Sequence, residues 1–409
     1  MPLSFLLTLN PGDHLAVFAG KTFSDTELLN GARKGLYERS RLLSPDATLS
    51  AIQDLKFWVA EELSFEEGAS ASFGRILSEL WHSEYLDQLP PLLNRFERLV
   101  CAYFVRRGSV TAFHGFCNAW REGVLRRILL FAEEGLELND PGHPPVPYAL
   151  LVAGSLGRRE QTLEDGSRYF LVWPEGDEGY FEQFAYRIMA ILEQCSLVGD
   201  IRPNTVGRIL WRGSLADWEE LAAAQGEGEE LSAHLELLSD LRHVYGDETI
   251  GSKATQMARS CLEGYRNDPH ITTLAGRQIA APVALGILGR IRVERTGEHV
   301  GSFNLAQSGL TPLVNAVRLL AMQHDLNPGP TLERLTALST LRILEEPYVK
   351  RIEAAYHLLA GLKIGKEIAL EQPYICPAGL TPVERQKLKA ALETVRHLQR
   401  LVRRAVVNR

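Results

Sequence analysis

The sequence predicts a mostly helical α+β protein in which a small mixed sheet is flanked by two helical regions. Apolar residues recur at helical spacing over most of the chain, and short apolar runs suited to strands occur only between about residues 148 and 211. The densest group of helix-breaking residues lies at 139–145, which reads NDPGHPP. We therefore expect a helical N-terminal region (1–140), a sheet region (141–225) and a helical C-terminal region (226–409).

Composition describes an ordinary globular protein. The 409 residues suffice for two or three domains of about 150 residues, and 45% of them are hydrophobic and 23% charged. A formal net charge of −7 gives no general attraction to nucleic acid or to an anionic membrane. The five cysteines form no C-x-x-C pair, which indicates reduced thiols. We expect a cytoplasmic protein without a signal peptide or transmembrane segment.

Helices are predicted on both sides of the sheet region. In the N-terminal region the spacing of Leu55, Trp58, Val59 and Leu63 is helical, and a long amphipathic helix is expected over 110–134. Two strands are predicted at 148–153 and 169–173, followed by a helix at 180–197 and an extended piece near 206–211. The helices predicted beyond it include 231–241, 248–265, 310–324, 331–341 and 382–407.

The turn after the first predicted strand has the residues of a phosphate site. Gly154 and Gly157 let the backbone approach a ligand closely, and the Ser155 hydroxyl can donate to phosphate oxygens. Arg158 adds a positive charge. The pattern alone also fits an ordinary strand-to-helix turn, because the lysine of a P-loop is missing.

The wider context of this turn resembles a known family. Residues 154–163, GSLGRREQTL, resemble the signature of a bacterial family of nucleotidyltransferases related to the N-terminal uridylyltransferase domain of the PII uridylyltransferase/uridylyl-removing enzyme. Further segments are similar to other parts of the family in the same order: 145–148, 211–218, 240–247, 297–299 and 331–335. The resemblance runs from about Val110 to the C-terminus. It implies a nucleotidyltransferase-like sheet domain followed by a helical C-terminal domain.

The resemblance also implies a metal site that this sequence does not complete. Family members continue with Asp-x-Asp on the second strand, where the two carboxylates hold divalent cations that bridge the nucleotide phosphates. These positions fall on Gly166 and Arg168, neither of which can ligate magnesium. Asp165 is the remaining candidate for a catalytic acid, or it is a solvated turn residue, since a one-residue slip turns a side chain to the opposite face of a strand. We expect no metal ligands.

Arg168 and the C-terminal domain supply two further observations. The Arg168 guanidinium could pair with phosphate in place of a metal, or form a salt bridge with Glu164 or Asp165. Asn304 and Ala306 occupy positions where family members tend to carry Asp and Lys. A second set of polar residues is therefore replaced.

Other candidate sites have ordinary structural interpretations. His243 and His299 could line a pocket, although histidines in helical proteins are more often hydrogen-bonded structural residues. The C-terminal helix carries many cations, which could bind nucleic acid but also complement the helix dipole. We expect no nucleic-acid partner. The basic residues concerned are Arg385, Lys387, Lys389, Arg396, Arg400, Arg403, Arg404 and Arg409.

Three functional hypotheses follow. The first is a signalling protein with a degraded metal site that binds a nucleotide or a protein partner and has weak or no activity; its nucleotide-binding residues are Gly154, Ser155, Gly157, Arg158 and Arg168. The second is an enzyme that uses magnesium and a nucleoside triphosphate to transfer UMP or AMP to a protein acceptor, with Asp165 as its catalytic acid. The third is a helical adaptor that binds no nucleotide.

Overall fold

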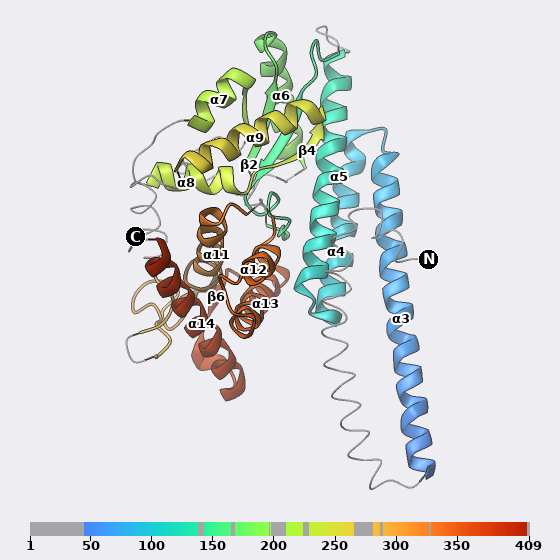
Figure 1. Ribbon diagram of the computed structural model, residues 1–409. Coiled ribbons are helices and arrows are strands. Elements are labelled where there is room, and N and C mark those ends of the chain that lie inside the picture. The colour runs from blue at the N-terminus through green and yellow to red at the C-terminus, as the bar shows by residue number, and fades with distance from the viewer. Residues whose placement is uncertain are drawn as a thin grey trace. The chain divides into compact units, whose positions relative to one another are not determined.

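The computed structural model describes residues 45–137, 143–164, 168–195, 197, 210–223, 229–265, 281–286, 289–326 and 329–406. It divides into two compact units, 1–127 and 128–409, each of which is described by itself. Within the described residues the chain is mostly helical with one small mixed sheet, as the sequence predicts (Figure 1). None of the helices described is long and apolar enough to cross a bilayer.

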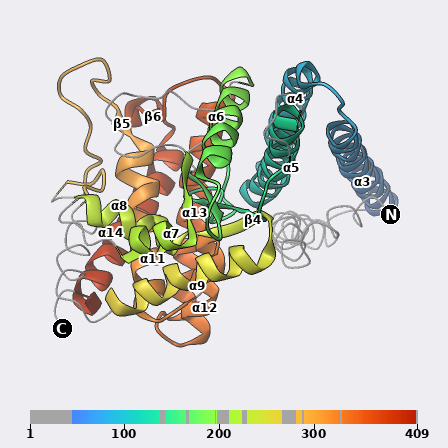
Figure 2. The ribbon, with the colours of Figure 1, turned by 90° about the horizontal axis from the view of Figure 1, so that it is seen from above.

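The N-terminal unit contains α3 (Pro45–Trp81), the 3₁₀ turn η1 (Leu86–Gln88), α4 (Leu89–Arg107) and most of α5 (Val110–Glu137). The helix α4 ends at Gly108, whose left-handed backbone (φ 62°) lets its N–H bond to the Phe104 carbonyl at 2.7 Å. Aromatic rings join the three helices, which lie side by side in Figure 2. Phe73 contacts Phe116 edge to face at 4.9 Å, and Phe96 stacks on Trp120 at 4.8 Å.

The second unit holds a four-stranded sheet in the order β3-β2-β1-β4. β1 (Ala149–Ala153) runs antiparallel to both β2 (Arg168–Trp173) and β4 (Arg242–Gly246), whereas β2 runs parallel to β3 (Leu210–Ser214). β1 is buried on both faces, which explains its continuous apolar sequence. The two strands predicted at 148–153 and 169–173 are therefore confirmed to within a residue.

Helices cover both faces of the sheet. The face that presents Leu151 and Phe170 packs on α7 (Leu215–Ala223), α8 (Glu229–Ser239) and α9 (Glu248–Tyr265), where Trp218 is buried. The opposite face packs on α6 (Glu178–Gln194), with Trp173 stacked on Phe181 at 4.2 Å. Figure 1 shows α7 and α9 on one side of the strands.

The fourth strand differs from the prediction. β4 lies beyond residue 225, in a segment expected to be part of the helical C-terminal region, and it pairs with β1 from Ala149↔Gly246 to Val152↔Arg242. Its residues are only partly buried, so the apolar pattern that reveals a strand is weak there. The sheet thus takes one edge from outside the region 141–225. Of the extended piece predicted near 206–211, residues 206–209 lie outside the described part.

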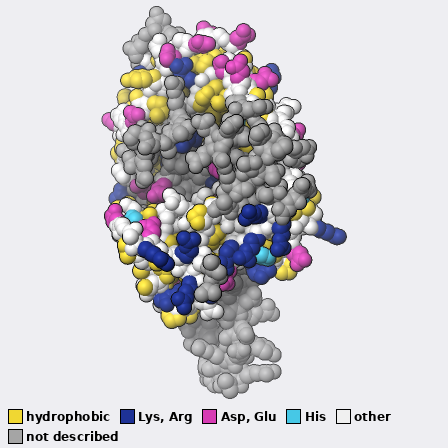
Figure 3. Space-filling view, turned by 90° about the vertical axis from the view of Figure 1, so that its left-hand side faces the viewer, with side chains coloured by type: hydrophobic (Ala, Val, Ile, Leu, Met, Phe, Trp, Pro, Cys, Tyr) yellow, Lys and Arg dark blue, Asp and Glu magenta, His cyan; other side chains and the backbone are white. Residues whose placement is uncertain are grey.

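The C-terminal helices form a bundle: α11 (Thr311–Gln323), α12 (Thr331–Thr340), α13 (Glu346–Ile368) and α14 (Pro382–Val406). A π-helical turn, η2 (Ala306–Leu310), leads into α11, a 3₁₀ turn, η3 (Pro377–Gly379), precedes α14, and β5 (Phe303–Asn304) pairs with β6 (Tyr374–Ile375). α14 buries Leu388, Leu392, Val395 and Val402 on one face. Figure 3 views the molecule from the left-hand side of Figure 1 and shows Lys and Arg side chains gathered over part of that surface.

Candidate functional site

The loop that follows β1 is a tight turn. Gly154 has a φ of 79°, a left-handed conformation that favours glycine. The Arg158 N–H donates to the Gly154 carbonyl at 3.0 Å, and the Glu160 N–H donates to the Ser155 carbonyl at 2.8 Å. Arg159 also has a positive φ of 56°, which is uncommon for a residue with a side chain. The predicted turn is present, and it contains backbone strain of the kind found at binding sites.

Buried polar side chains hold the loop in this shape. The Ser155 hydroxyl donates to Gln161 Oε1 at 2.9 Å, and Gln161 is completely buried. Gln161 Nε2 in turn donates to the carbonyl oxygens of Thr162 and Glu164, both at 3.0 Å. The Ser155 hydroxyl, which was predicted to donate to a phosphate, thus donates to Gln161. Gln161 also connects the loop to the segment that leads to β2.

Arg158 points into the protein. Its Nη1 lies 2.6 Å from Asp240 Oδ2 and its Nε lies 2.8 Å from Glu160 Oε2, with 13% of the side chain exposed. Glu160 also accepts a hydrogen bond of 2.5 Å from the backbone N–H of Thr331, the first residue of α12. A carboxylate is stabilised at a helix N-terminus. Burial alone would raise the pKa of Glu160, but Arg158 and the Thr331 hydrogen bonds lower it.

Asp240 is the centre of a buried ionic cluster. Its carboxylate is 1% exposed and accepts bonds from Arg158, from Arg318 Nη2 of α11 at 2.8 Å and from Arg334 Nη2 of α12 at 2.9 Å. Burial would raise the pKa of Asp240, but Arg318, Arg158 and Arg334 together hold it well below its usual value. We call Arg158, Asp240, Arg318 and Arg334 the Asp240 cluster. It connects the loop to α11 and α12.

Gly157 allows the loop to approach this cluster. A Cβ atom at Gly157 would overlap the carbonyl oxygen of Asp240 and would lie 2.9 Å from the Cα of Ala153. Only glycine fits so close to a neighbouring backbone. Its role in the described structure is thus close packing against Asp240.

A second set of contacts lies at the other end of the loop. Thr162 Oγ1 donates to Glu367 Oε1 of α13 at 3.1 Å, and Lys363 Nζ lies 3.3 Å from Glu164 Oε2 and also pairs with Glu367. Burial raises the pKa of Glu367 against the opposing charge of Lys363. We call Thr162, Glu164, Lys363 and Glu367 the Lys363 cluster. It connects the residues immediately before 165–167 to α13.

The position of Arg168 decides whether a metal fits here. Arg168 is the first residue of β2, is partly buried, and is paired in register with Ala153, the last residue of β1. A guanidinium therefore stands where the resemblance places the second metal-binding carboxylate, and a cation cannot ligate a cation. Asp165 and Gly166 lie outside the described residues. Among the residues that the structure does describe, no three His, Cys, Asp or Glu are grouped to hold a metal ion.

The donor set present does not fit magnesium, and no reaction step can be drawn through that ion from the described residues. What the arrangement offers is a glycine-rich loop beside a guanidinium at the end of two buried strands. Such a site can bind an anion through charge and hydrogen bonds.

The other candidates of the sequence have structural contacts. His243 Nε2 lies 2.8 Å from the Tyr245 carbonyl oxygen, and His299 stacks on Tyr374 at 3.6 Å. Asn304 Oδ1 accepts the Gln307 N–H at 2.9 Å. Sequence reasoning assigned no role to Asp240, Arg318, Arg334, Lys363 or Glu367. The only signal was that Asp240 and Arg334 fall in segments that resemble the family.

Two family models match the chain. The model described as "Putative nucleotidyltransferase DUF294" matches residues 94–230, and the model described as "Putative nucleotidyltransferase substrate binding domain" matches residues 270–406. Together they cover about two thirds of the chain in the order expected. The chain belongs to this nucleotidyltransferase-like family. A comparison with curated proteins gave no match.

The two matched ranges meet at the site. The nucleotidyltransferase-like range contains the loop, β1 and β2, while the substrate-binding range contains Arg318, Arg334, Lys363 and Glu367. The Lys363 cluster joins the two ranges directly, whereas the Asp240 cluster joins Arg158 of the first range to Arg318 and Arg334 of the second through Asp240, which lies between the matched ranges.

Proposed function

We propose that this member of the nucleotidyltransferase-like family binds a nucleotide at the end of β1 and β2 and does not transfer it by a metal-dependent route. The observation that carries the proposal is the pairing of Arg168 with Ala153. The register supports the proposal because it sets Arg168 beside the last residue before the glycine-rich loop, at the position to which the resemblance assigns a metal-holding carboxylate. A guanidinium can pair bidentately with phosphate instead.

Two features support binding of a nucleotide in particular. Gly154, with its left-handed backbone, and Ser155 are only partly buried, and they directly follow Ala153, the residue paired with Arg168. The segment 154–163 also resembles the signature of uridylyltransferase-related proteins, which favours a nucleoside triphosphate over other anions. Three residues of the predicted set have contacts within the protein: the Ser155 hydroxyl donates to Gln161, Gly157 packs against Asp240, and Arg158 pairs with Glu160 and Asp240. We assign to Arg158 the positioning of the loop.

A signalling role is supported by the connections of the loop. Glu160 bonds to the first residue of α12, and Thr162 bonds to Glu367 of α13. A ligand that moves the loop would have to change these contacts, so it would bias the C-terminal helices. We propose that a protein partner recognises this change. In the enzymatic alternative, the same helices would present a protein acceptor for UMP or AMP.

Calorimetric titration with ATP and UTP, with magnesium and with EDTA, tests the proposal. We expect saturable binding of at least one nucleotide in EDTA, and a loss of affinity of about tenfold or more in Arg168→Ala. Arg212→Ala is the matched control, because Arg212 lies on the neighbouring β3 and pairs with Glu182 at 2.7 Å. Its affinity should equal that of the wild type.

Transfer assays separate the three hypotheses. With radiolabelled ATP or UTP, magnesium or manganese and candidate acceptors, we expect no labelled protein. Magnesium-dependent labelling that Asp165→Asn abolishes would establish the enzyme instead. No binding of either nucleotide under any condition would favour the helical adaptor.

A further inference from the structure

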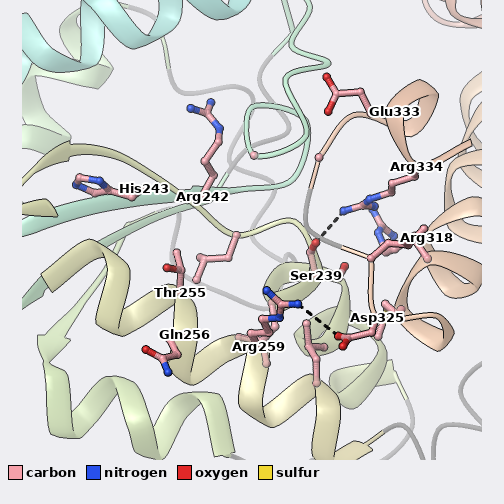
Figure 4. A pocket seen from close by; sticks show the side chains of 18 of the residues that line it. Ser239, Arg242, His243, Thr255, Gln256, Arg259, Arg318, Asp325, Glu333 and Arg334 are labelled. Atoms are coloured by element: carbon pink, nitrogen blue, oxygen red, sulfur yellow. Dashed lines mark hydrogen bonds and ion pairs between the residues drawn. The ribbon is translucent and has the colours of Figure 1, made fainter. Parts of the chain in front are cut away.

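A cavity of about 800 Å³ lies beside the Asp240 cluster. Its walls come from β4 and α9 on one side and from α11 and α12 on the other, and Figure 4 shows Arg318 and Arg334 entering it opposite Thr255 and Arg259. The volume is within the range of sites for small molecules. Arg168 is not among the residues that line it.

Arg334 carries unused hydrogen-bond donors in this cavity. Its side chain is 3% exposed, and its Nη2 bonds to the Ser239 carbonyl at 2.8 Å and to Asp240 Oδ1 at 2.9 Å. Its Nε and Nη1 are buried and have no hydrogen-bond partner among the described residues. Buried donors are nearly always paired, and a buried guanidinium with two free nitrogens is costly. The free nitrogens therefore indicate that a partner is missing at this point.

The charges around Arg334 favour an anion as the missing partner. Arg158 has Glu160 as a second carboxylate, and Arg318 has Glu236 at 3.4 Å. Among the described residues, Arg334 pairs with the Asp240 carboxylate alone, which it shares with both other arginines. Burial and the positive charges of Arg318 and Arg158 lower the pKa of Arg334 despite the charge of Asp240. Within the described structure, Arg334 is therefore the one arginine of the three without a carboxylate of its own.

The rest of the cavity is lined by both polar and apolar side chains, and two of its acids are paired. Arg259 contacts Glu263 at 3.4 Å and Asp325 at 3.7 Å, so these carboxylates do not form a strongly negative wall. Thr255 and Gln256 add a hydroxyl and an amide to the lining. A ligand with hydroxyl or amino groups would find partners there.

We infer that this cavity binds a small polar molecule through one oxyanion group, a phosphate or a carboxylate, which pairs with Arg334. The inference does not depend on Arg168, although Gly157 of the loop after β1 also lines the cavity. It rests on three observations: the cavity, the buried nitrogens of Arg334 that have no partner among the described residues, and the lack of a second carboxylate there beside Arg334. The bound oxyanion would complete the cluster that holds the loop after β1, so this ligand would stabilise the loop.

Titration of the full chain with inorganic phosphate, pyrophosphate and citrate tests the inference, and the three probes distinguish phosphate from carboxylate. We expect saturable binding of at least one probe, and Arg334→Gln should weaken it at least about tenfold. Arg400→Gln, an exposed arginine of α14 outside the cavity, should leave the affinity unchanged.

A second pair of variants keeps the test valid if Arg334→Gln does not fold. Ser252 and Lys253 are neighbouring exposed residues of α9, but only Ser252 lines the cavity. Ser252→Trp should fill part of the cavity and weaken binding, whereas Lys253→Trp should not. Equal binding by the two variants, or no binding of any probe to the wild type, would refute the inference. Binding that is lost in Arg168→Ala but retained in Arg334→Gln would also refute it, while supporting the nucleotide site.

Discussion

The loop between β1 and β2 is held by two clusters with opposite charge balance. In the Asp240 cluster three guanidinium groups surround one carboxylate, and two nitrogens of Arg334 have no partner among the described residues. In the Lys363 cluster one ammonium group serves two carboxylates, and the buried Glu367 Oε2 has no partner in the described part of the chain. One end of the loop therefore has spare donors and the other end has a spare acceptor.

The two clusters also differ in the number of cations that pair with the central carboxylate. Asp240 pairs with three buried cations, and its removal would leave Arg334 without a carboxylate among the described residues, while Arg158 keeps Glu160 and Arg318 keeps Glu236. Glu367 neutralises only Lys363, which keeps Glu164 as a second partner. A cluster that depends on one central charge should be far more sensitive to substitution than one in which the charges are shared.

The largest effect is expected for Asp240→Asn. The substitution removes the only negative charge that Arg318 and Arg334 share and leaves three buried guanidinium groups together. Breaking a buried ion pair in this way costs about 3–5 kcal/mol in the free energy of unfolding. Chemical denaturation measures it, and Asp87→Asn, at an exposed aspartate of η1, is the control. A loss within about 0.5 kcal/mol would mean that Asp240 is not central.

Gly157→Ala should have the next largest effect. The added Cβ would overlap the Asp240 carbonyl, a backbone atom that cannot rotate away, so the loop must move from the cluster. Forcing an extra carbon into a packed site costs about 1–3 kcal/mol. Gly179→Ala in α6 is the control, because nothing lies within 4 Å of the added carbon there. Equal stability of the two variants would show that the loop does not need close contact with Asp240.

The sequence could predict the elements of this molecule better than the contacts between them. The bounds 248–265 of α9 were predicted to the residue because its apolar face is regular, and the turn at Gly154 followed from its glycines. β4 was missed because an edge strand of partly buried residues has no clear period. The Asp240 cluster joins residues 78 to 94 positions apart, and no local pattern encodes such pairs.

The sequence could not predict that the Arg158 side chain points into the protein either. An arginine after a glycine-rich turn is the residue type expected to meet a phosphate, and only the fold shows that Asp240 and Glu160 take up its nitrogens. Gly166 and Arg168, at the positions where the resemblance places metal-binding carboxylates, were in contrast visible in the sequence. Chemistry that depends on the identity of one residue can be read without the fold, whereas chemistry that depends on a partner cannot.

Acid should destabilise the protein through the Asp240 cluster, at a lower pH than the one at which Glu367 takes up its proton. The pKa of Asp240 and of Glu160 is lower in the folded protein, so their contribution to stability is present above the unfolded pKa of about 4 and is lost as the pH falls further. The loss should approach about 1.4 kcal/mol for each carboxyl group and each pH unit. Chemical denaturation between pH 5 and pH 2 measures how steeply the free energy of unfolding changes with pH. Asp240→Asn should reduce this slope. An unchanged slope in that variant would contradict the assignment.

Glu367→Gln should have the smallest effect and the opposite dependence on pH. The pKa of Glu367 is raised by burial, so its contribution is present below the unfolded pKa of about 4.3 and is lost as the pH rises through the folded pKa. The glutamine amide oxygen can still accept from Thr162, and Lys363 keeps Glu164. We expect a change within about 1 kcal/mol at neutral pH, because lost attraction and relieved burial of charge oppose each other. The variant should also lack the wild-type decline in stability with rising pH. A loss as large as that of Asp240→Asn would show that both ends of the loop depend on a single charge, and the contrast between the two clusters would be wrong.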